Sequence, residues 1–275
     1  MTIATGFTSR GGIVLGCDSE ETTGSVKIPK EKMTLYSKDV HQGKVRAAIV
    51  GAGDAVFCDM ISAELWKEIT LAEGNIDSIL AALKEKLIKI HAKYHKFSED
   101  AVQYEVDALI ALSVPDHHPR LFHAQGPAVA EVDDYRCIGY GLELGNYILA
   151  RMWDFGRTID QATVVAAYLL QQVKTYVRFC GGKSHIVTMT TDGAVSRVHR
   201  LEEAGILGFL AEYEQFVANA MVVLGNAKSN EDDIQMAGAQ LVHLLLTYRK
   251  EMQESADEKI ANLHSVMEQI RKMQK

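Results

Sequence analysis

The order of strand-like and helix-like segments is the feature that most constrains the fold of this chain. A block of short β-type runs comes first and a pair of amphipathic helical segments follows. The same block then repeats before one last strand over residues 184–190. Because strands and helices occur in blocks and do not alternate, the order argues against parallel βαβ units. It predicts an α+β domain in which two sheets pack face to face and each carries two helices on its outer side.

The boundaries of these segments follow from changes in hydrophobic period and from turn residues. Strands are predicted over residues 3–9, 12–17, 45–50, 106–114, 120–124, 129–132, 135–138 and 184–190. Residues 19–34 are polar and irregular. One predicted helix is capped by Asp54, and the next by Asp77 or Ser78. Two further helices are predicted over residues 144–153 and 159–177.

After about residue 200 the composition shifts to helix-forming residues, without a proline or a strand pattern. Apolar residues recur there at spacings of three and four, from Ile234 through Leu245 and Tyr248 to Ile270, as on one face of an amphipathic helix. We therefore predict a folded domain over residues 1–200 and a helical C-terminal extension over residues 201–275. The extension either folds back on its own domain or contacts another subunit, and the sequence leaves both possibilities open.

The composition excludes several classes of function. A net charge of −7 gives no electrostatic basis for binding nucleic acid or an anionic membrane. Four cysteines without a close pair fit a reducing compartment, and they suit neither a disulfide framework nor a zinc site. The chain begins without a signal-peptide pattern and has no run of 18 apolar residues, so we expect a cytoplasmic protein.

The chemistry suggested by the sequence begins at its second residue. Initiator methionine is normally removed before a residue as small as threonine, and here Thr2 follows Met1. Removal leaves the α-amine of Thr2 beside its own hydroxyl. With an unperturbed pKa of about 7.7–8.0, that amine can accept the hydroxyl proton and so activate the oxygen as a nucleophile.

Six short motifs then occur in the same order as in a known family. They are residues 12–19 (GIVLGCDS), 31–36 (EKMTLY), 50–54 (VGAGD), 138–141 (IGYG), 155–162 (FGRTIDQA) and 179–182 (FCGG). Together with Thr2, they resemble the proteasome-type threonine peptidases, which include 20S β-subunits and bacterial ATP-dependent relatives. The resemblance covers residues 2–198. It implies an N-terminal-nucleophile hydrolase fold, which is a four-layer αββα sandwich, here followed by the helical extension.

The resemblance also implies a catalytic role for four residues. Thr2 would be the nucleophile and its own amine the base. Lys32 would lower the pKa of the threonine hydroxyl by placing a positive charge near it, and Asp18 would keep that lysine ionised. The backbone N–H of Gly51 would stabilise the oxyanion of the tetrahedral intermediate.

The expected substrate-binding residues are Ile49, Gly53 and Tyr140. By the resemblance, Ile49 and Gly53 would border a mostly apolar specificity pocket. Tyr140 stands where the family usually has a serine, and Val177 stands where it usually has an aspartate. The tyrosine hydroxyl could replace the serine, or its bulk could block the cleft. The sequence therefore leaves open whether the site is catalytically active.

The function expected from the resemblance is a threonine-type endopeptidase that acts on polypeptides as a homo-oligomeric ring with an ATP-dependent unfoldase. We expect no cofactor, no metal ion, and no nucleic-acid or membrane partner. His91 and His95 have the spacing of helical metal ligands, but lysines surround them and favour a solvated face. Two alternatives remain. One is a non-catalytic, ring-forming structural homologue, and the other is an amidohydrolase of the same N-terminal-nucleophile class acting on a small substrate.

Overall fold

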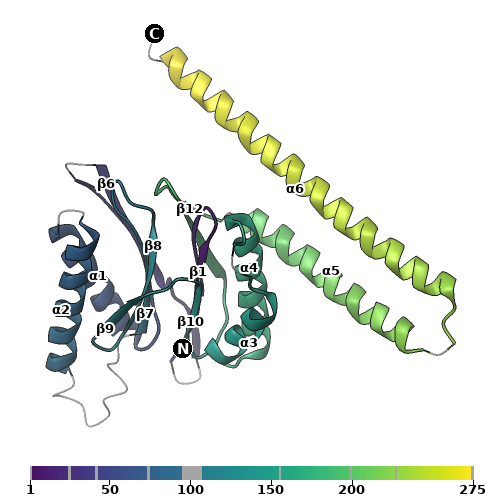
Figure 1. Ribbon diagram of the computed structural model, residues 1–275, viewed down its shortest axis with the longest axis horizontal. Coiled ribbons are helices and arrows are strands. Elements are labelled where there is room, and N and C mark those ends of the chain that lie inside the picture. Colours follow the sequence, from purple (N-terminus) through teal and green to yellow (C-terminus); the bar gives the residue numbers. More distant parts are fainter. Residues whose placement is uncertain are drawn as a thin grey trace. The chain divides into compact units, whose positions relative to one another are not determined.

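The computed structural model describes residues 2–23, 26–40, 43–72, 75–94, 107–154, 156–198, 200–226 and 228–273. The chain divides into two compact units, Met1–Glu203 and Ala204–Lys275. The first unit contains the sheets, and the second contains only helix within the described residues (Figure 1).

The first unit contains a five-stranded antiparallel sheet that begins with the N-terminal strand. Its strand order is β10-β1-β2-β11-β12. These strands are β1 (Ile3–Ser9), β2 (Gly12–Asp18), β10 (Tyr135–Gly139), β11 (Ser184–Thr190) and β12 (Val195–Arg197). In this register Ile3 lies opposite Gly139, and Ala4 lies opposite Cys17. Because β1 has a neighbour on each side, the residue that precedes it is held at the end of a paired strand.

A second antiparallel sheet contains the strands that border the candidate site. Its order is β5-β6-β7-β8-β9. These strands are β5 (Met33–Val40), β6 (Gly43–Gly51), β7 (Asp107–Ser113), β8 (Arg120–Gln125) and β9 (Ala128–Glu131). A separate two-stranded hairpin, β3 (Glu20–Thr23) and β4 (Val26–Pro29), connects the first sheet to β5.

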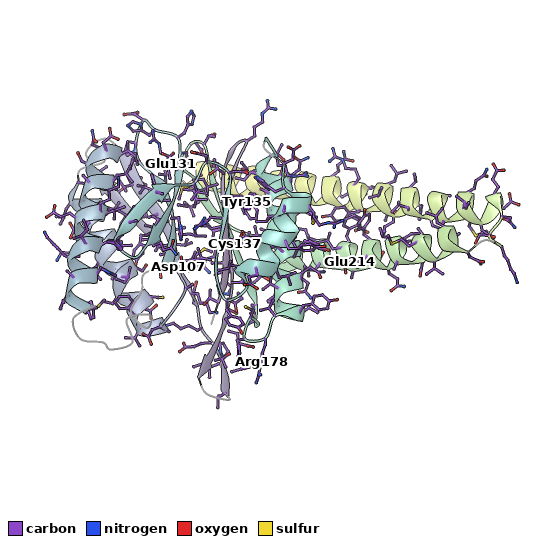
Figure 2. The ribbon with its side chains drawn as sticks, turned by 60° about the horizontal axis from the view of Figure 1, so that its bottom comes forward. Asp107, Glu131, Tyr135, Cys137, Arg178 and Glu214 are labelled. Atoms are coloured by element: carbon purple, nitrogen blue, oxygen red, sulfur yellow. The ribbon has the colours of Figure 1, made fainter. Side chains whose placement is uncertain are left out.

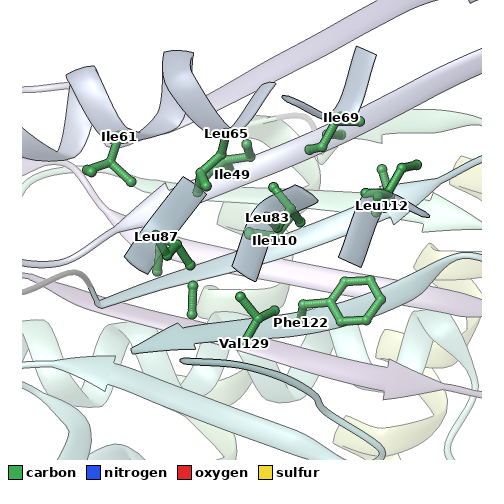
Figure 3. Close-up of a cluster of buried hydrophobic side chains, with 14 of the residues drawn as sticks. Ile49, Ile61, Leu65, Ile69, Leu83, Leu87, Ile110, Leu112, Phe122 and Val129 are labelled. Carbon is green, nitrogen blue, oxygen red and sulfur yellow. The ribbon is translucent and has the colours of Figure 1, made fainter. Parts of the chain in front are cut away.

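Two helices cover the outer face of the second sheet. They are α1 (Ala55–Leu71) and α2 (Ile76–Tyr94), and α1 begins where the Asp54 carboxylate accepts a hydrogen bond from the Phe57 N–H at 2.8 Å. Figure 3 shows the buried side chains between these helices and the sheet, including Leu65 of α1 and Leu83 of α2. Apolar residues in these segments recur every three or four positions, so a helix places them in one stripe. Burial of that stripe against the sheet stabilises the helical conformation.

The first sheet carries the other pair of helices, α3 (Leu142–Met152) and α4 (Ile159–Tyr176) (Figure 1). Helix α3 contacts β1 and β10, and α4 contacts β1, β2 and β11. The inner faces of the two sheets share a second apolar core. Ala4 and Leu15 contribute to it from the first sheet, and Val50, Leu109 and Leu121 contribute from the second. The mixed α+β class with antiparallel sheets and helices, predicted from the sequence, is confirmed.

Several element boundaries differ from the sequence prediction. The stretch over residues 19–34 was expected to be irregular, but it contains β3, β4 and the start of β5. The side chains of β4 are all exposed, so this short hairpin lacks the alternation that identifies a strand in a sequence. The cap of α2 is Asn75 rather than Asp77 or Ser78, because the Asn75 side-chain oxygen accepts from both of their N–H groups at 3.0 Å.

The second unit is built from α5 (Arg200–Gly225), which begins just before it, and α6 (Glu231–Met273). Phe209 of α5 stacks on Tyr248 of α6, with ring centroids 3.9 Å apart. On the predicted apolar face, Leu241 and Tyr248 are half-buried, whereas Ile234 and Leu245 are exposed. Contact of this face with another subunit stays a prediction. The residues of that series beyond 254 lie outside the side chains that the structure describes.

Helix α5 bears on the prediction that the chain has no membrane-spanning segment. Among the described residues, the segment Ala204–Gly225 is the one helix long and apolar enough to cross a membrane by length and composition. Its best window has a mean hydropathy of 1.2, and 6% of that window is buried. The search for 18 consecutive apolar residues misses this segment because polar residues interrupt it. One such helix is weak evidence for membrane insertion.

The apolar contact between α1 and the second sheet can be tested with two leucines on the same helix. Leu65 is fully buried, whereas Leu71 is 63% exposed. We expect Leu65→Ala to lower the free energy of unfolding by about 3 kcal/mol, because it removes buried methyl groups and leaves a cavity. The control Leu71→Ala should change it by less than about 0.5 kcal/mol in urea denaturation. Equal effects would contradict the described packing.

The role of the C-terminal helices can be tested by removing α6. We expect deletion of residues 231–275 to weaken self-association, because α6 exposes apolar side chains that a second copy would bury. A milder variant replaces Leu245 and Leu246, which are 44% and 65% exposed, by glutamate, with Thr247→Glu as control. Sedimentation velocity should show a smaller assembly for the first two variants only. An unchanged number of subunits would contradict the prediction.

Candidate active site

Thr2 lies directly before β1 and is 4% exposed. Its carbonyl oxygen accepts a hydrogen bond from the Gly141 N–H at 3.3 Å. Gly139 has a φ of 86°, and a Cβ atom at this position would lie 2.4 Å from the same carbonyl oxygen. The turn after β10 therefore requires glycine at residue 139, because both the backbone conformation and the approach to Thr2 exclude a side chain.

Asp18, at the end of β2, is completely buried and is held by three hydrogen bonds. Its Oδ1 atom accepts from the Lys32 ammonium at 2.7 Å and from the Ile3 N–H at 3.2 Å. Its Oδ2 atom accepts from the Gly181 N–H at 3.0 Å. A buried carboxylate is tolerated only when such partners replace water. The same three bonds fix the start of β1 and the lysine relative to each other.

Lys32 lies directly before β5, with its side chain 8% exposed. Its ammonium is bound to Asp18 and lines the same pocket as Thr2. A positive charge beside a hydroxyl favours the deprotonated form of that hydroxyl, and this effect is larger where water is excluded. The arrangement is therefore suited to making the Thr2 oxygen more nucleophilic.

One pocket brings together five of the seven predicted site residues. It contains about 440 Å³ of space outside the protein atoms, part of it open to solvent. The predicted residues that line it are Thr2, Lys32, Ile49, Gly51 and Gly53. Asp18 supports the pocket through its bond to Lys32.

The strand pairing around Gly51 determines the direction in which its N–H points. The N–H of the next residue, Ala52, donates to the Asp107 carbonyl of β7 at 2.8 Å. Successive N–H groups of a strand point to opposite edges, so the Gly51 N–H points away from β7. On that side lies the start of β5, next to Lys32. The Cβ of the nearby Cys58 lies 3.0 Å from the Cβ that a larger residue at 51 would carry.

Tyr140, like Asp18, does not line the pocket, and none of its described contacts is with a residue that does. It is 54% exposed, and its ring meets the ring of Phe179 edge to face, with centroids 5.6 Å apart. Phe179 has a φ of 73°, which is rare for a residue with a side chain. Val177, where an aspartate was expected from the resemblance, ends α4 by donating its N–H to the Val173 carbonyl. The tyrosine therefore does not fill the pocket beside Thr2.

The pocket also contains residues that the sequence did not single out. They are Glu21, Lys30, Thr34, Ala55, Cys58, Asp59 and Ser62. Lys30 and Asp59 form an ion pair at 2.5 Å. Charged and hydroxyl groups therefore share the wall with apolar surface, which is the larger part, and a mostly apolar specificity pocket stays a prediction. Of these residues, Cys58 and Ser62 could have been grouped from the sequence, because their spacing of four places both on the same face of α1.

The cysteines near the site are unsuited to act as nucleophiles. Burial raises the pKa of the Cys58 thiol to about 11, and the negative charges of Asp54, Asp59 and Asp107 act in the same direction. Burial also raises the pKa of Cys137 to about 11 and that of Cys180 to about 12. Figure 2 labels Asp107 on β7 and Cys137 on β10, which are strands of different sheets. At neutral pH these thiols stay protonated.

Metal ligation has no structural support within the described residues. They contain no group of three or more histidine, cysteine, aspartate or glutamate residues placed to hold an ion. Of the two histidines with ligand-like spacing, His91 is in α2 and His95 lies outside the described residues.

The contact between Gly139 and Thr2 can be tested against a glycine with similar strain but no neighbour. Gly156 has a φ of 96° and open space where a Cβ would be. We expect Gly156→Ala to cost about 1–2 kcal/mol of stability from the backbone conformation alone. Gly139→Ala should cost about 1–3 kcal/mol more, because the added carbon meets the Thr2 carbonyl. Equal unfolding free energies in urea would show that the turn does not constrain Thr2.

No protein-family sequence model and no curated protein sequence matches this chain. Solved structures match it in fold. Anbu (ancestral beta-subunit) from Yersinia bercovieri has 15% sequence identity and a TM-score of 0.67, with 82% of this chain and 100% of that chain covered. A mutant of Anbu from Hyphomicrobium sp. strain MC1 has 13% identity and a TM-score of 0.67, with 81% and 97% covered. Another structure of Anbu from that strain has 12% identity and a TM-score of 0.64, with 79% and 97% covered.

These matches correct the family resemblance drawn from the sequence. The motifs resemble 20S β-subunits and bacterial ATP-dependent threonine peptidases, but the structures to which the chain is similar are Anbu proteins, a proteasome-related but distinct family. The motifs are short strand ends and glycine turns that related folds share, so they do not separate one family from another. At 12–15% identity the matches show a common fold and no more.

Proposed function

We propose that the chain is a threonine-type endopeptidase whose nucleophile is Thr2, exposed when Met1 is removed. The observation that supports this most directly is the arrangement around a single pocket. Thr2, Lys32 and Gly51 line the pocket, and the buried Asp18 holds the lysine. A hydroxyl nucleophile with its own amine as base, a cation that favours its deprotonated form, and an oxyanion donor are together sufficient for amide hydrolysis by this route.

In the proposed first step, the α-amine of Thr2 accepts the proton of the Thr2 hydroxyl. The Lys32 ammonium stabilises the oxygen anion that develops, and Asp18 keeps the ammonium in place. The threonine oxygen then bonds to the carbonyl carbon of the substrate. The electron pair of the carbonyl moves to its oxygen, where the Gly51 N–H donates a hydrogen bond.

In the proposed second step, the bond from carbon to the substrate nitrogen breaks. The nitrogen leaves as an amine and takes the proton held by the Thr2 α-amine. The acyl group remains as an ester on Thr2. Water then attacks the ester carbonyl carbon and gives a proton to the α-amine. The bond from this carbon to the Thr2 oxygen breaks, the oxygen takes the proton back from the α-amine, and the acid product leaves with Thr2 restored.

The wider description of the protein is part of the same proposal. The first unit would be the four-layer αββα sandwich of N-terminal-nucleophile hydrolases, with the domain over residues 1–200 and the helical extension over 201–275. The packing of α1 and α2 on one sheet and of α3 and α4 on the other supports it. We further propose polypeptide substrates, a homo-oligomeric ring in the cytoplasm, an ATP-dependent unfoldase and no cofactor.

A non-catalytic structural role is the second candidate, and the residues near the end of α4 favour it. Val177 supplies no carboxylate where the sequence resemblance places an accessory aspartate, and Tyr140 faces Phe179. A protein with that role would not need a free Thr2 amine. An amidohydrolase acting on a small substrate would use the same chemistry but would not cleave polypeptides.

The proposal is tested by intact-mass measurement combined with a threonine-reactive epoxyketone or lactone probe. We expect the purified protein to lack the mass of Met1 and to gain one adduct, located on Thr2 by peptide mapping. Thr2→Ala should remove the adduct and leave the circular dichroism spectrum unchanged. Retained Met1, or no adduct on a processed protein, would contradict the peptidase and favour the structural role.

A further inference from the structure

The pocket beside Thr2 carries charges that the proposed activation of Thr2 does not use. Glu21, on β3, lines the pocket together with the ion pair of Lys30 and Asp59. Among the residues that the structure describes, Glu21 has no ion-pair partner within 4 Å. One carboxylate of this wall is thus available to a ligand.

Among the side chains of this wall, carboxylates outnumber the ammonium groups that are not already paired with Asp18. Glu21 and Asp59 together oppose the single ammonium of Lys30, since Lys32 is paired with Asp18. Two more carboxylates, those of Asp54 and Asp107, are close enough to raise the pKa of the Cys58 thiol, which itself lines the pocket.

The remaining groups of the wall present hydroxyl groups beside apolar surface. Thr34 and Ser62 present hydroxyl groups, and the Ser62 hydroxyl is within 3.1 Å of the Tyr36 hydroxyl. Ile49 and Ala55 are the larger apolar contributions. A carboxylate with hydroxyl neighbours provides the acceptors that an ammonium or guanidinium group requires.

The position of the pocket determines which residue of a substrate would enter it. Thr2 would attack a carbonyl carbon whose oxygen lies at the Gly51 N–H, and both residues line the pocket. The side chain on the same residue as that carbonyl, here called the acyl-side residue, therefore points into the pocket. This step rests on the proposed function.

We propose that the pocket selects lysine or arginine as the acyl-side residue, with Glu21 as the carboxylate that pairs with its charge. Asp59, held in place by Lys30, completes the negative wall. The substrate class is then a polypeptide cleaved after a basic residue, in place of the apolar residue expected from the sequence.

Two measurements on the full chain test this selection. Acetylated tripeptide amides that end in arginine, leucine or glutamate are titrated calorimetrically to give dissociation constants. The same tripeptides with an aminocoumarin leaving group give kcat/KM. We expect the arginine peptide to exceed the leucine peptide about five-fold in both affinity and kcat/KM, the size of effect that an exposed ion pair gives. The glutamate peptide should be the poorest.

Two variants separate a local effect from a change in net charge. Glu21→Gln should remove most of the difference between the arginine and leucine peptides. Glu85→Gln makes the same change in net charge on the exposed face of α2, far along the chain from the pocket, and should leave the difference unchanged.

The results distinguish the selection from the chemistry. A preference for leucine, equal binding of all three peptides, no binding at all, or an unchanged ratio in Glu21→Gln would overturn the proposed selection. Cleavage accompanied by a leucine preference would overturn it while leaving the peptidase in place. Preferred binding of arginine that Glu21→Gln abolishes, without cleavage and without an adduct on Thr2, would support the selection and contradict the peptidase.

Discussion

The buried carboxylate of Asp18 is the group on which the rest of the site depends. Moving such a charge out of water costs several kcal/mol, so the fold must supply partners for it. It does so from three places in the chain: the N–H that begins β1, the ammonium of Lys32, and the N–H of Gly181. The start of the chain, the segment before β5 and the segment before β11 are thereby joined at one point.

The segment before β11 shows how closely the backbone fits this point. A Cβ on Gly181 would lie 2.6 Å from the Glu20 carboxylate, and one on Gly182 would lie 2.8 Å from the Ser19 hydroxyl. That hydroxyl accepts from the Lys183 N–H at 2.7 Å. Glycine allows the chain to pass directly over the end of β2, and this approach brings an N–H to the otherwise isolated oxygen of Asp18.

The sequence predicts the elements whose apolar residues recur with a helical or strand period. It does not predict features that depend on contacts between residues far apart in the chain. The core helices and most strands follow from their apolar spacing, and the mixed α+β class is correct. The side chains of β4 are all exposed, so the β3–β4 hairpin leaves no alternating pattern in the sequence, and the position of Glu21 is not predicted. That Thr2, Lys32 and Gly51 lie at one site was predicted from a family resemblance. The motifs behind that resemblance do not distinguish one proteasome-related family from another.

Replacing Asp18 by asparagine tests most directly whether this carboxylate organises the site. The side chain keeps its shape, but its amide nitrogen cannot accept a hydrogen bond, and its charge no longer holds Lys32. We expect the rate of epoxyketone addition to Thr2 to fall about 100-fold or more, and the free energy of unfolding to fall by about 3 kcal/mol. An Asp18→Asn protein that reacts at the wild-type rate would contradict the central role of Asp18.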